Sequence, residues 1–313
     1  MGTPDFAVES LRILVENKYN VVGVITMPDK ASGRGHKIQY SPVKKYALEN
    51  NLPLLQPEKL KDENFIRELK SWNANLQIVV AFRMLPEIVW NMPQYGTFNL
   101  HASLLPQYRG AAPINWAIIN GEKETGVTTF FLAHEIDTGK IILQESISIS
   151  ETDNAGIVHD RLMHTGAQLV KKTVDIIISG NVNSLSQEQL YDKEEILKTA
   201  PKIFKDTVCR INWNKPSTEI YNLIRGLSPY PAAWTEMYSG ENTIPVKIYS
   251  SQIINDKPDS GAGYIDTDNK TYIKVATQDG YISIMELQLP NKKALKTEEL
   301  LRGYTIPANS YFE

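Results

Sequence analysis

The sequence has one cysteine, no long apolar run and almost no excess of charge, and each of these shortages excludes a class of protein. A single cysteine, Cys209, cannot build a disulfide framework, a thiolate zinc site or an iron–sulfur cluster. No apolar stretch reaches the roughly 18 residues of a membrane-spanning helix, and no signal peptide opens the chain. We therefore expect a soluble cytoplasmic protein, and the absence of an obvious exposed apolar stripe indicates a monomer.

The balance of 33 basic against 36 acidic residues gives a net charge of −3. A whole-molecule field of this sign does not attract phosphate, so any contact with nucleic acid must come from a local basic patch.

The 313 residues are enough for two domains, and the two halves of the chain differ in texture. Up to Gly180, β-branched runs such as Asn20–Thr26 alternate with helical patterns, which is typical of a doubly wound α/β domain with a mostly parallel sheet. Five short strands in the last third predict a small OB-like β-barrel. We predict domains over 1–182 and 204–313, joined by a polar linker over 183–203.

The N-terminus departs from this pattern. Gly2-Thr3-Pro4-Asp5 resembles the turn between a first strand and its helix, and a helix is expected from Phe6 to about Asn17. Only Met1 precedes this turn, whereas a doubly wound domain places its first strand in the middle of the sheet. Loss of that strand would leave an apolar slot with unpaired backbone. We therefore expect the natural product to start upstream, with Met1 as an internal residue.

The most informative stretch runs from Gly96 to Gly110 and reads GTFNLHASLLPQYRG. Asn99 and His101 lie two residues apart on a predicted strand, so their side chains point to one face, at the end of the strand where open α/β sheets bind ligands. An amide and an imidazole can both hydrogen-bond a carbonyl oxygen as it becomes an oxyanion, which suits acyl-group chemistry. Taken alone, the pattern is weak and more often marks a strand end that only holds a loop.

Longer motifs carry a family resemblance. The segment NLHASLLPQYRGAAPI from Asn99 to Ile114, followed by TGVT from Thr125 and DTG from Asp137, resembles the folate-dependent formyltransferases. The segments GTPDFAV and PDKASGRGHKIQYSP, together with APKI and QLP further along, resemble the members of this family that act on an aminoacylated tRNA. The resemblance implies a Rossmann-like formyltransferase domain followed by a tRNA-binding barrel. It also implies transfer of the formyl group of 10-formyltetrahydrofolate to the α-amino group of methionyl initiator tRNA, without a metal, which gives N-formylmethionyl-tRNA for translation initiation.

The same resemblance assigns roles to residues of this sequence. Asn99 and His101 would stabilise the oxyanion, and Asp137 would help move a proton from the attacking nitrogen towards the leaving one. The folate site would consist of a turn beside the catalytic pair and of backbone around the pterin ring. The turn comprises Ser103, Leu104, Leu105 and Pro106, and the backbone segment comprises Ala81, Phe82, Arg83, Met84 and Leu85.

Basic residues provide the expected contacts with tRNA. The predicted loop from Lys30 to Lys37 carries two glycines that flank Arg34, and such a loop can wrap the end of an acceptor stem. From composition alone, a solvated surface loop is an equal alternative. Similarity to the tRNA-directed enzymes makes Arg34 the best single candidate for acceptor recognition. The full set of tRNA-binding candidates is Lys30, Arg34, Lys37, Lys202, Lys205 and Arg210, with Lys292, Lys293 and Lys296 as further phosphate contacts.

Other interpretations share some of these features. Asp137-Thr138-Gly139 and Asp259-Ser260-Gly261 mimic the half-sites of an aspartic protease, but the repeated all-β lobe of those enzymes is absent. A hydrolase that releases formate, or a transferase acting on an amino sugar or glycinamide ribonucleotide, would share the catalytic trio. The Gly-Arg-Gly loop and the added barrel favour the tRNA-directed enzyme. Retention of all three polar groups argues against a non-catalytic RNA-binding protein.

Overall fold

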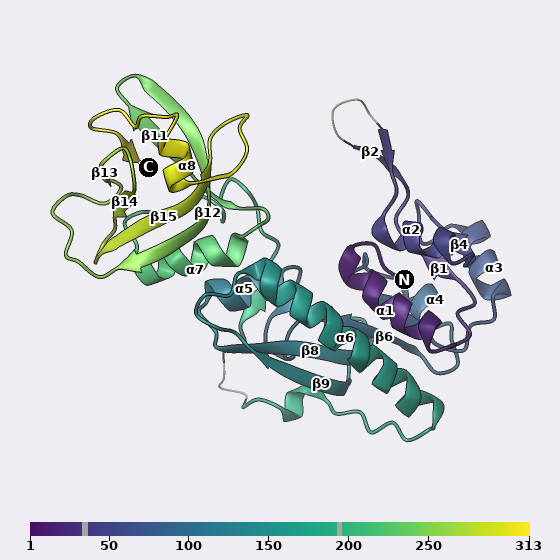
Figure 1. The fold of residues 1–313 in the computed structure, drawn as a ribbon. Coiled ribbons are helices and arrows are strands. Elements are labelled where there is room, and N and C mark those ends of the chain that lie inside the picture. Colours follow the sequence, from purple (N-terminus) through teal and green to yellow (C-terminus); the bar gives the residue numbers. More distant parts are fainter. Residues whose placement is uncertain (33–36, 193–195) are drawn as a thin grey trace. The chain divides into compact units, whose positions relative to one another are not determined.

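The computed structural model describes residues 1–32, 37–192 and 196–313, and of residues 30–38 it gives at most the backbone. The chain forms two compact units (Figure 1). The first comprises residues 1–110, 124–147 and 159–199, and the second comprises residues 111–123, 148–158 and 200–313. Two short internal segments therefore belong with the C-terminal part of the chain. The predicted limits at 1–182, 183–203 and 204–313 stay a prediction.

The first unit contains a mixed sheet with the strand order β5-β6-β8-β9. Its strands are β5 (Gln77–Val80), β6 (Thr97–His101), β8 (Glu124–Phe131) and β9 (Ile141–Ser148). β5 and β6 are parallel, and β6 and β8 are antiparallel. A separate parallel pair joins β1 (Val24–Ile25) to β4 (Leu54–Leu55), so that β1 is much shorter than the predicted strand over Asn20–Thr26. β9 was not anticipated from the sequence.

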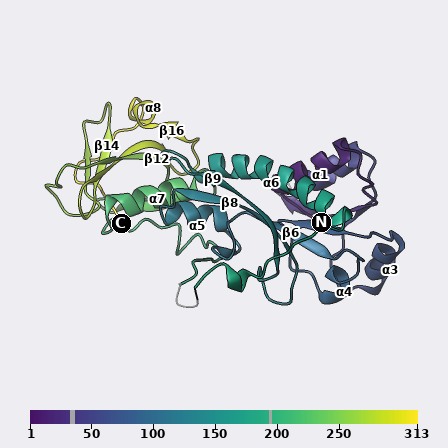
Figure 2. The ribbon, with the colours of Figure 1, turned by 90° about the horizontal axis from the view of Figure 1, so that it is seen from below.

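Helices cover both faces of this sheet, as the sequence predicts for a doubly wound domain. α1 (Asp5–Glu16) and α6 (Ala155–Ile178) lie on one face, and α3 (Glu63–Ser71) and α4 (Glu87–Trp90) lie on the other (Figure 2). The helix starts have a local cause. The Ser41 hydroxyl accepts a hydrogen bond of 3.1 Å from the Lys44 amide at the start of α2 (Pro42–Glu49). None of the helices in the described residues is long and apolar enough to span a bilayer.

Short elements complete the first unit. They are the two-stranded hairpin of β2 (Lys30–Ser32) and β3 (Lys37–Gln39), the strand β7 (Arg109–Gly110), the 3₁₀ turn η1 (Gln187–Gln189) and the strand β10 (Thr199–Ala200) at its boundary.

The second unit is a nearly closed antiparallel barrel, which confirms the predicted second fold class. Its strand order is β13-β14-β15-β12-β11-β17, with β16 beside β15. A bridge between Tyr264 and Tyr311 links the two ends of this order. The strands are β11 (Ala233–Ser239), β12 (Asn242–Ile254), β13 (Ile265–Thr267), β14 (Ile273–Ala276), β15 (Tyr281–Gln288), β16 (Leu295–Lys296) and β17 (Tyr311–Phe312), and α8 (Thr297–Leu301) lies near β15.

Helix α7 (Ser217–Leu227) ties the two internal segments to the barrel unit. It packs on α5 (Pro113–Ile119), and at Gly226 a methyl group would lie 2.6 Å from a side-chain carbon of Ile119. The guanidinium of Arg225 is buried, which lowers its pKa, and it donates to the carbonyl of Asp153 at 3.0 Å. Residues 111–123 and 148–158 thus complete the packing around α7.

Closure of the barrel requires glycine at position 263. Gly263 has a φ of +87°, and a Cβ there would lie 2.2 Å from the carbonyl oxygen of Phe312, whose amide donates to the Gly263 carbonyl. We expect Gly263→Ala to lower the free energy of unfolding by about 3 kcal/mol, because left-handed strain and the clash add. Gly240→Ala is the control, since its φ is +59° but nothing lies near its Cβ. Calorimetry that shows equal losses in both variants would contradict the closure argument.

Candidate active site

The site lies where two parallel strands end. Because β5 and β6 are parallel neighbours, with Val79 opposite Asn99, the segments that follow Val80 and His101 leave the same edge of the sheet. Asn99 and His101 are two residues apart on β6 and therefore face the same side. The sequence prediction of a polar pair at this edge is consistent with the strand bounds.

His101 is held by a hydrogen bond at one of its two ring nitrogens. Its side chain is buried, and Nε2 lies 2.9 Å from the carbonyl oxygen of Tyr108. A carbonyl only accepts, so this contact assigns a proton to Nε2. Nδ1 lies 3.8 Å from Oδ2 of Asp137, which is too long for a direct hydrogen bond but close enough for ion pairing with a charged ring. Both the Nδ1 position and the carboxylate thus keep hydrogen-bonding capacity for a substrate.

Asp137 lies in the connection between β8 and β9, in a backbone conformation with a φ of +55°. Its Oδ2 atom accepts a hydrogen bond of 3.0 Å from the amide of Gly110. The adjacent chain is also confined, because a Cβ at Gly139 would lie 1.6 Å from the carbonyl oxygen of Phe131. The structure therefore brings Asp137 to His101 although 36 positions of sequence separate them.

A residue that the sequence analysis did not single out holds this segment. The side chain of Gln187 is buried, and its amide nitrogen donates to the carbonyls of Asp137 and Gly139, each at 2.8 Å. Its Oε1 atom accepts from Arg109 at 3.0 Å and 2.6 Å. Gln187 lies in the segment predicted as a linker, and no motif marks it. Only the contact across 50 residues of sequence shows its place.

Thr128 holds the turn of the predicted folate site, residues 103–106, through two hydrogen bonds. The hydroxyl of Thr128 donates to the carbonyl of Ser103 at 2.6 Å and accepts from the amide of Leu105 at 3.1 Å. Ser103, Leu105 and Pro106 are buried, so their side chains support the turn. Leu104 is half-buried and packs over Gly126, where an added methyl group would meet it at 2.5 Å.

The segment after β5 has a different character. Ala81 and Met84 are exposed, while Leu85 packs in the core. The guanidinium of Arg83 donates to the carbonyls of Pro57 and Glu58, and burial lowers its pKa, so this side chain serves the local fold. Within the described chain, the backbone amides of residues 82–85 donate to no other group. They remain available as donors to a polar ring.

The basic residues predicted to contact tRNA are only partly described. Arg34 lies outside the described residues, and at Lys30 and Lys37 only the backbone is given. The predicted loop between them has paired ends, since β2 and β3 form an antiparallel ladder with Ser32 opposite Lys37. Figure 1 shows this hairpin projecting from the helices of its unit.

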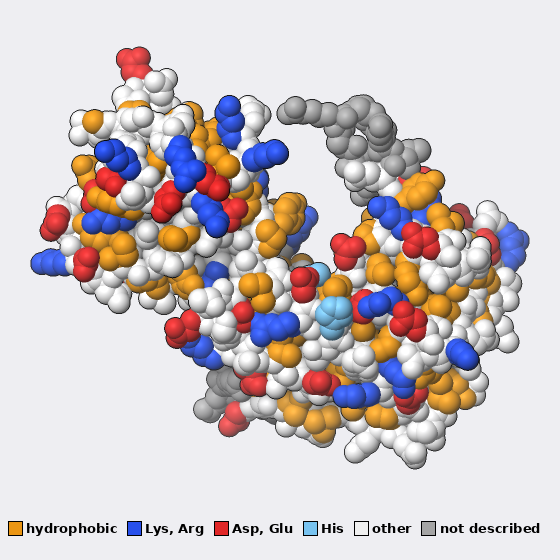
Figure 3. Space-filling view, viewed as in Figure 1, with side chains coloured by type: hydrophobic (Ala, Val, Ile, Leu, Met, Phe, Trp, Pro, Cys, Tyr) orange, Lys and Arg blue, Asp and Glu red, His pale blue; other side chains and the backbone are white. Residues whose placement is uncertain are grey.

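In the barrel unit the candidates are exposed but differ in their partners. The Lys202 ammonium lies 5.5 Å from the ring centroid of Phe204, and Lys205 is exposed. Arg210 is paired with Glu236 at 2.8 Å, so a phosphate would have to displace that carboxylate. Lysine and arginine side chains alternate with acidic ones on the face of this unit seen in Figure 3. Lys292, Lys293 and Lys296 are exposed as well.

Among residues 1–32, 37–192 and 196–313, no three His, Cys, Asp or Glu side chains converge as metal ligands would.

The chain thus combines an α/β unit, a polar site at the ends of β5 and β6 and an appended barrel, and family models match both of its parts. The family model "Formyl transferase" matches residues 1–174, and the model "Formyl transferase, C-terminal domain" matches residues 203–305. The chain therefore belongs to the formyl transferase family.

Curated relatives of high sequence identity share one activity within this family. Methionyl-tRNA formyltransferase of Bacteroides thetaiotaomicron is 64% identical over 307 residues, which cover 98% of this chain and 95% of the relative. Methionyl-tRNA formyltransferase of Flavobacterium johnsoniae is 55% identical over 306 residues, with coverage of 98% and 95%. The family resemblance inferred from the sequence motifs is thereby confirmed.

Solved structures show the same fold at lower identity. One is WlaRD, a sugar 3N-formyl transferase in the presence of dTDP and 5-N-formyl-THF, with a TM-score of 0.64, 24% identity and coverage of 93% of this chain and 97% of that chain. Another is an N-formyltransferase from Helicobacter canadensis in complex with folinic acid and dTDP-3-aminofucose, with a TM-score of 0.62, 23% identity and coverage of 90% and 96%.

Proposed function

We propose that this protein transfers the formyl group of 10-formyltetrahydrofolate to the α-amino group of methionyl initiator tRNA. The product is N-formylmethionyl-tRNA for translation initiation. The observation that carries the proposal is the 64% identity to a methionyl-tRNA formyltransferase over 98% of this chain. The closeness of His101 and Asp137 at the strand edge supports it. Formyl transfer needs a hydrogen-bond donor to the developing oxyanion and, beside it, an acceptor for the proton of the attacking amine.

The folate, when bound, supplies a formyl carbon that is activated by its bond to nitrogen. The amino group of methionine forms a new bond to that carbon, and the bond to the folate nitrogen breaks. Asn99 and His101 donate hydrogen bonds to the formyl oxygen as negative charge develops on it. Because Nε2 of His101 donates its proton to the Tyr108 carbonyl, Nδ1 is the nitrogen that faces the substrate, and it donates when the ring is charged and both nitrogens carry a proton. Asp137 accepts the proton of the attacking amine and passes it towards the leaving nitrogen.

The residues at the strand edge fit a reduced pterin. A pterin ring needs hydrogen-bond donors and acceptors along its edge and apolar contacts on its faces. The backbone amides of residues 82–85, which donate to no other described residue, provide the donors, and Leu104 and Met84 provide apolar surface. Ser103, Leu105 and Pro106 act by holding the backbone of the turn. No metal takes part in this scheme.

The acceptor end of the tRNA is expected at the hairpin that carries Arg34, and its phosphates at Lys30, Lys37, Lys202, Lys205 and Arg210. We propose that the protein works as a monomer in the cytoplasm, where charged tRNA and folate are both present. The exposed lysines of the barrel unit suit phosphate contacts.

The function is tested by offering 10-formyltetrahydrofolate with one of four acceptors. These are charged initiator tRNA, uncharged initiator tRNA, a dTDP-linked amino sugar, or water alone. Consumption of the donor only with charged initiator tRNA is the expected result. Consumption with the amino sugar or with water would replace the proposal by a sugar N-formyltransferase or a formate-releasing hydrolase.

Gln187 is expected to position Asp137, so Gln187→Glu should lower kcat about ten- to a hundredfold. The variant is isosteric and keeps an acceptor for Arg109, but it loses the two donors to the carbonyls of Asp137 and Gly139. KM for the tRNA should stay unchanged. Gln189→Glu, an exposed position on the same 3₁₀ turn, is the control.

A double variant separates positioning from general damage. If Gln187 acts through Asp137, then Gln187→Glu should add little to the loss already caused by Asp137→Asn. Fully additive losses in kcat, or a kcat for Gln187→Glu equal to that of the unchanged protein, would show that Gln187 does not position Asp137.

Arg34→Ala should raise KM for charged tRNA about tenfold, which corresponds to the loss of roughly 1.4 kcal/mol of binding. We expect kcat and KM for the folate to change little. Arg34→Lys keeps the charge and should recover part of the affinity. The same KM should rise steeply with salt in the unchanged protein, since bound phosphates release counterions. An unaltered KM in Arg34→Ala would show that this hairpin does not contact the acceptor.

A further inference from the structure

The turn that follows β6 leads to the carbonyl group that orients His101. The Ser103 hydroxyl donates to the carbonyl of Gln107 at 2.7 Å, and the Gln107 amide donates to the carbonyl of Leu104 at 3.1 Å. The next carbonyl in the chain, that of Tyr108, lies 2.9 Å from Nε2 of His101. The position of this one carbonyl therefore decides which nitrogen of the neutral ring carries the proton.

The backbone at Tyr108 has a conformation that needs support from its surroundings. Its φ is +62°, in the left-handed region, which a residue with a side chain keeps only where other contacts hold it. The side chain of Tyr108 is buried, which holds the residue in place as a whole. Rotation of its backbone would nevertheless carry the carbonyl away from the ring of His101.

Lys198 gives this support from a distant part of the sequence. Its carbonyl accepts a hydrogen bond of 2.7 Å from the amide of Tyr108. Its amide donates to Oε1 of Gln107 at 2.8 Å, across 91 residues of sequence. All three residues belong to the first unit, although Lys198 falls in the segment that the sequence predicts as a linker. The side chain of Gln107 thus takes the place that a backbone carbonyl has in a β-ladder.

We propose that Gln107 is a positioning residue for formyl transfer, which acts through the Tyr108 carbonyl to keep Nε2 of His101 engaged and Nδ1 directed at the substrate. Without the contact to Lys198, the backbone at Tyr108 can leave the left-handed region. The proton of the neutral ring can then move to Nδ1, on the side of Asp137. The effect on turnover rests on the proposed function, whereas the effect on the ring does not.

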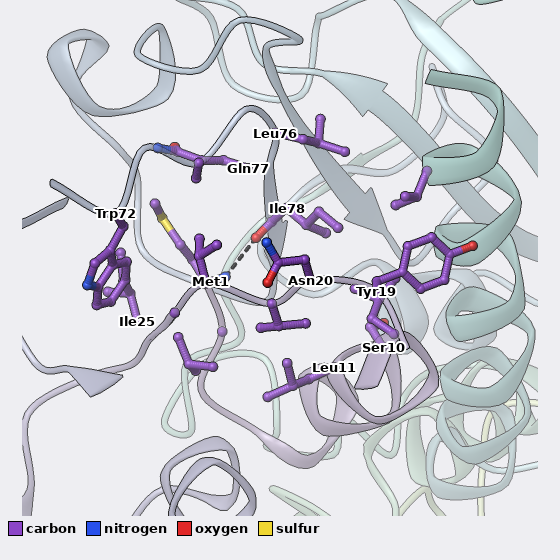
Figure 4. A pocket seen from close by; sticks show the side chains of 18 of the residues that line it. Met1, Ser10, Leu11, Tyr19, Asn20, Ile25, Trp72, Leu76, Gln77 and Ile78 are labelled. Carbon is purple, nitrogen blue, oxygen red and sulfur yellow. Dashed lines mark hydrogen bonds between the residues drawn. The ribbon is translucent and has the colours of Figure 1, made fainter. Parts of the chain in front are cut away.

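Two substitutions of similar size separate this role from packing. Gln107→Glu keeps an oxygen that accepts from the Lys198 amide, and Gln107→Leu removes it. Leu11→Ala is the control for a general loss of stability. Leu11 lines a cavity of about 380 Å³ between β1 and β5 (Figure 4), and none of the described residues 101–108 contributes to that lining.

The first readout is the protonated nitrogen of His101 at a pH where the ring is neutral. It is observed by two-bond ¹⁵N–¹H correlation in protein labelled at its five histidines, with His101→Ala for assignment. The second readout is the single-turnover rate with 10-formyltetrahydrofolate and charged initiator tRNA. Tm is measured for every variant.

The unchanged protein, Gln107→Glu and Leu11→Ala should all carry the proton on Nε2. Gln107→Leu should move a large fraction of it to Nδ1 and lower the rate about tenfold, whereas Gln107→Glu should stay within a factor of about two. KM for the tRNA should not follow the position of the proton.

A proton that stays on Nε2 in Gln107→Leu would overturn the proposal, whatever the rate. The same movement in Leu11→Ala at an equal loss of Tm would also overturn it, because loosening of the whole unit would then be the cause. A moved proton without a loss of rate would exclude a role in formyl transfer. If the ring responds as expected but the donor is consumed only with another acceptor, the proposed function fails and the positioning of His101 by Gln107 stands.

Discussion

His101→Ala is expected to lower kcat for formyl transfer by about two to four orders of magnitude. The variant removes the ring whose Nε2 is held by Tyr108 and whose Nδ1 faces Asp137. The loss should fall on kcat, because the missing hydrogen bond to the formyl oxygen is made chiefly as charge develops there. KM for the tRNA and the dissociation constant of the folate should change little.

His164→Ala is the matched control for this variant. His164 belongs to the same unit, lies 3.3 Å from Glu9 and is 61% exposed at its side chain, so it contacts a carboxylate without lining the strand edge. Single-turnover kinetics with charged tRNA separate the chemical step from binding, and circular dichroism checks that both variants fold. Turnover retained by His101→Ala would exclude this histidine from the chemistry.

Asp137→Asn is expected to reduce kcat by a similar factor, about two to four orders of magnitude. The amide oxygen of asparagine can still accept the hydrogen bond from Gly110, so the connection between β8 and β9 keeps its shape. The variant loses the negative charge beside Nδ1 of His101 and the ability to accept a proton from the attacking amine. A large loss without a change in Tm would therefore identify a chemical role.

The control for the carboxylate is Asp160→Asn. Asp160 also lies beside a histidine, at 3.0 Å from Nδ1 of His159, but its side chain is 72% exposed on α6. Its removal should leave kcat unchanged within a factor of about two. If Asp137→Asn and Asp160→Asn behaved alike, the pair of Asp137 with His101 would be structural only.

Local signals in the sequence predicted much of the first unit. Ser41 and Asp62 cap their helices through hydrogen bonds to amides three residues further on. β6 spans Thr97–His101 and contains both Asn99 and His101, which the sequence analysis places together on one predicted strand. These features depend on contacts within a few residues, which sequence patterns record.

Features that depend on contacts between distant parts of the sequence could not be predicted from the sequence. Gln187 reaches the Asp137 segment across 50 residues, and Arg83 binds carbonyls 25 and 26 residues earlier in the chain. β1 is shorter than its β-branched run indicates, since its ladder with β4 comprises only Val24 and Ile25. The roles of Asn99, His101 and Asp137 came from resemblance to a family, and no pattern of spacing alone would have joined Asp137 to the other two.

The interleaving of the two units affects how the protein can be dissected. A fragment that began after residue 200 would lack α5 and the carbonyl of Asp153, and it would leave the guanidinium of Arg225 without that acceptor. The face of α7 near Gly226 would lose its cover from Ile119. On the ribosome, by contrast, residues 111–158 emerge before the barrel is synthesised. Truncated proteins made for tRNA-binding studies should therefore start before residue 111 and retain residues 148–158.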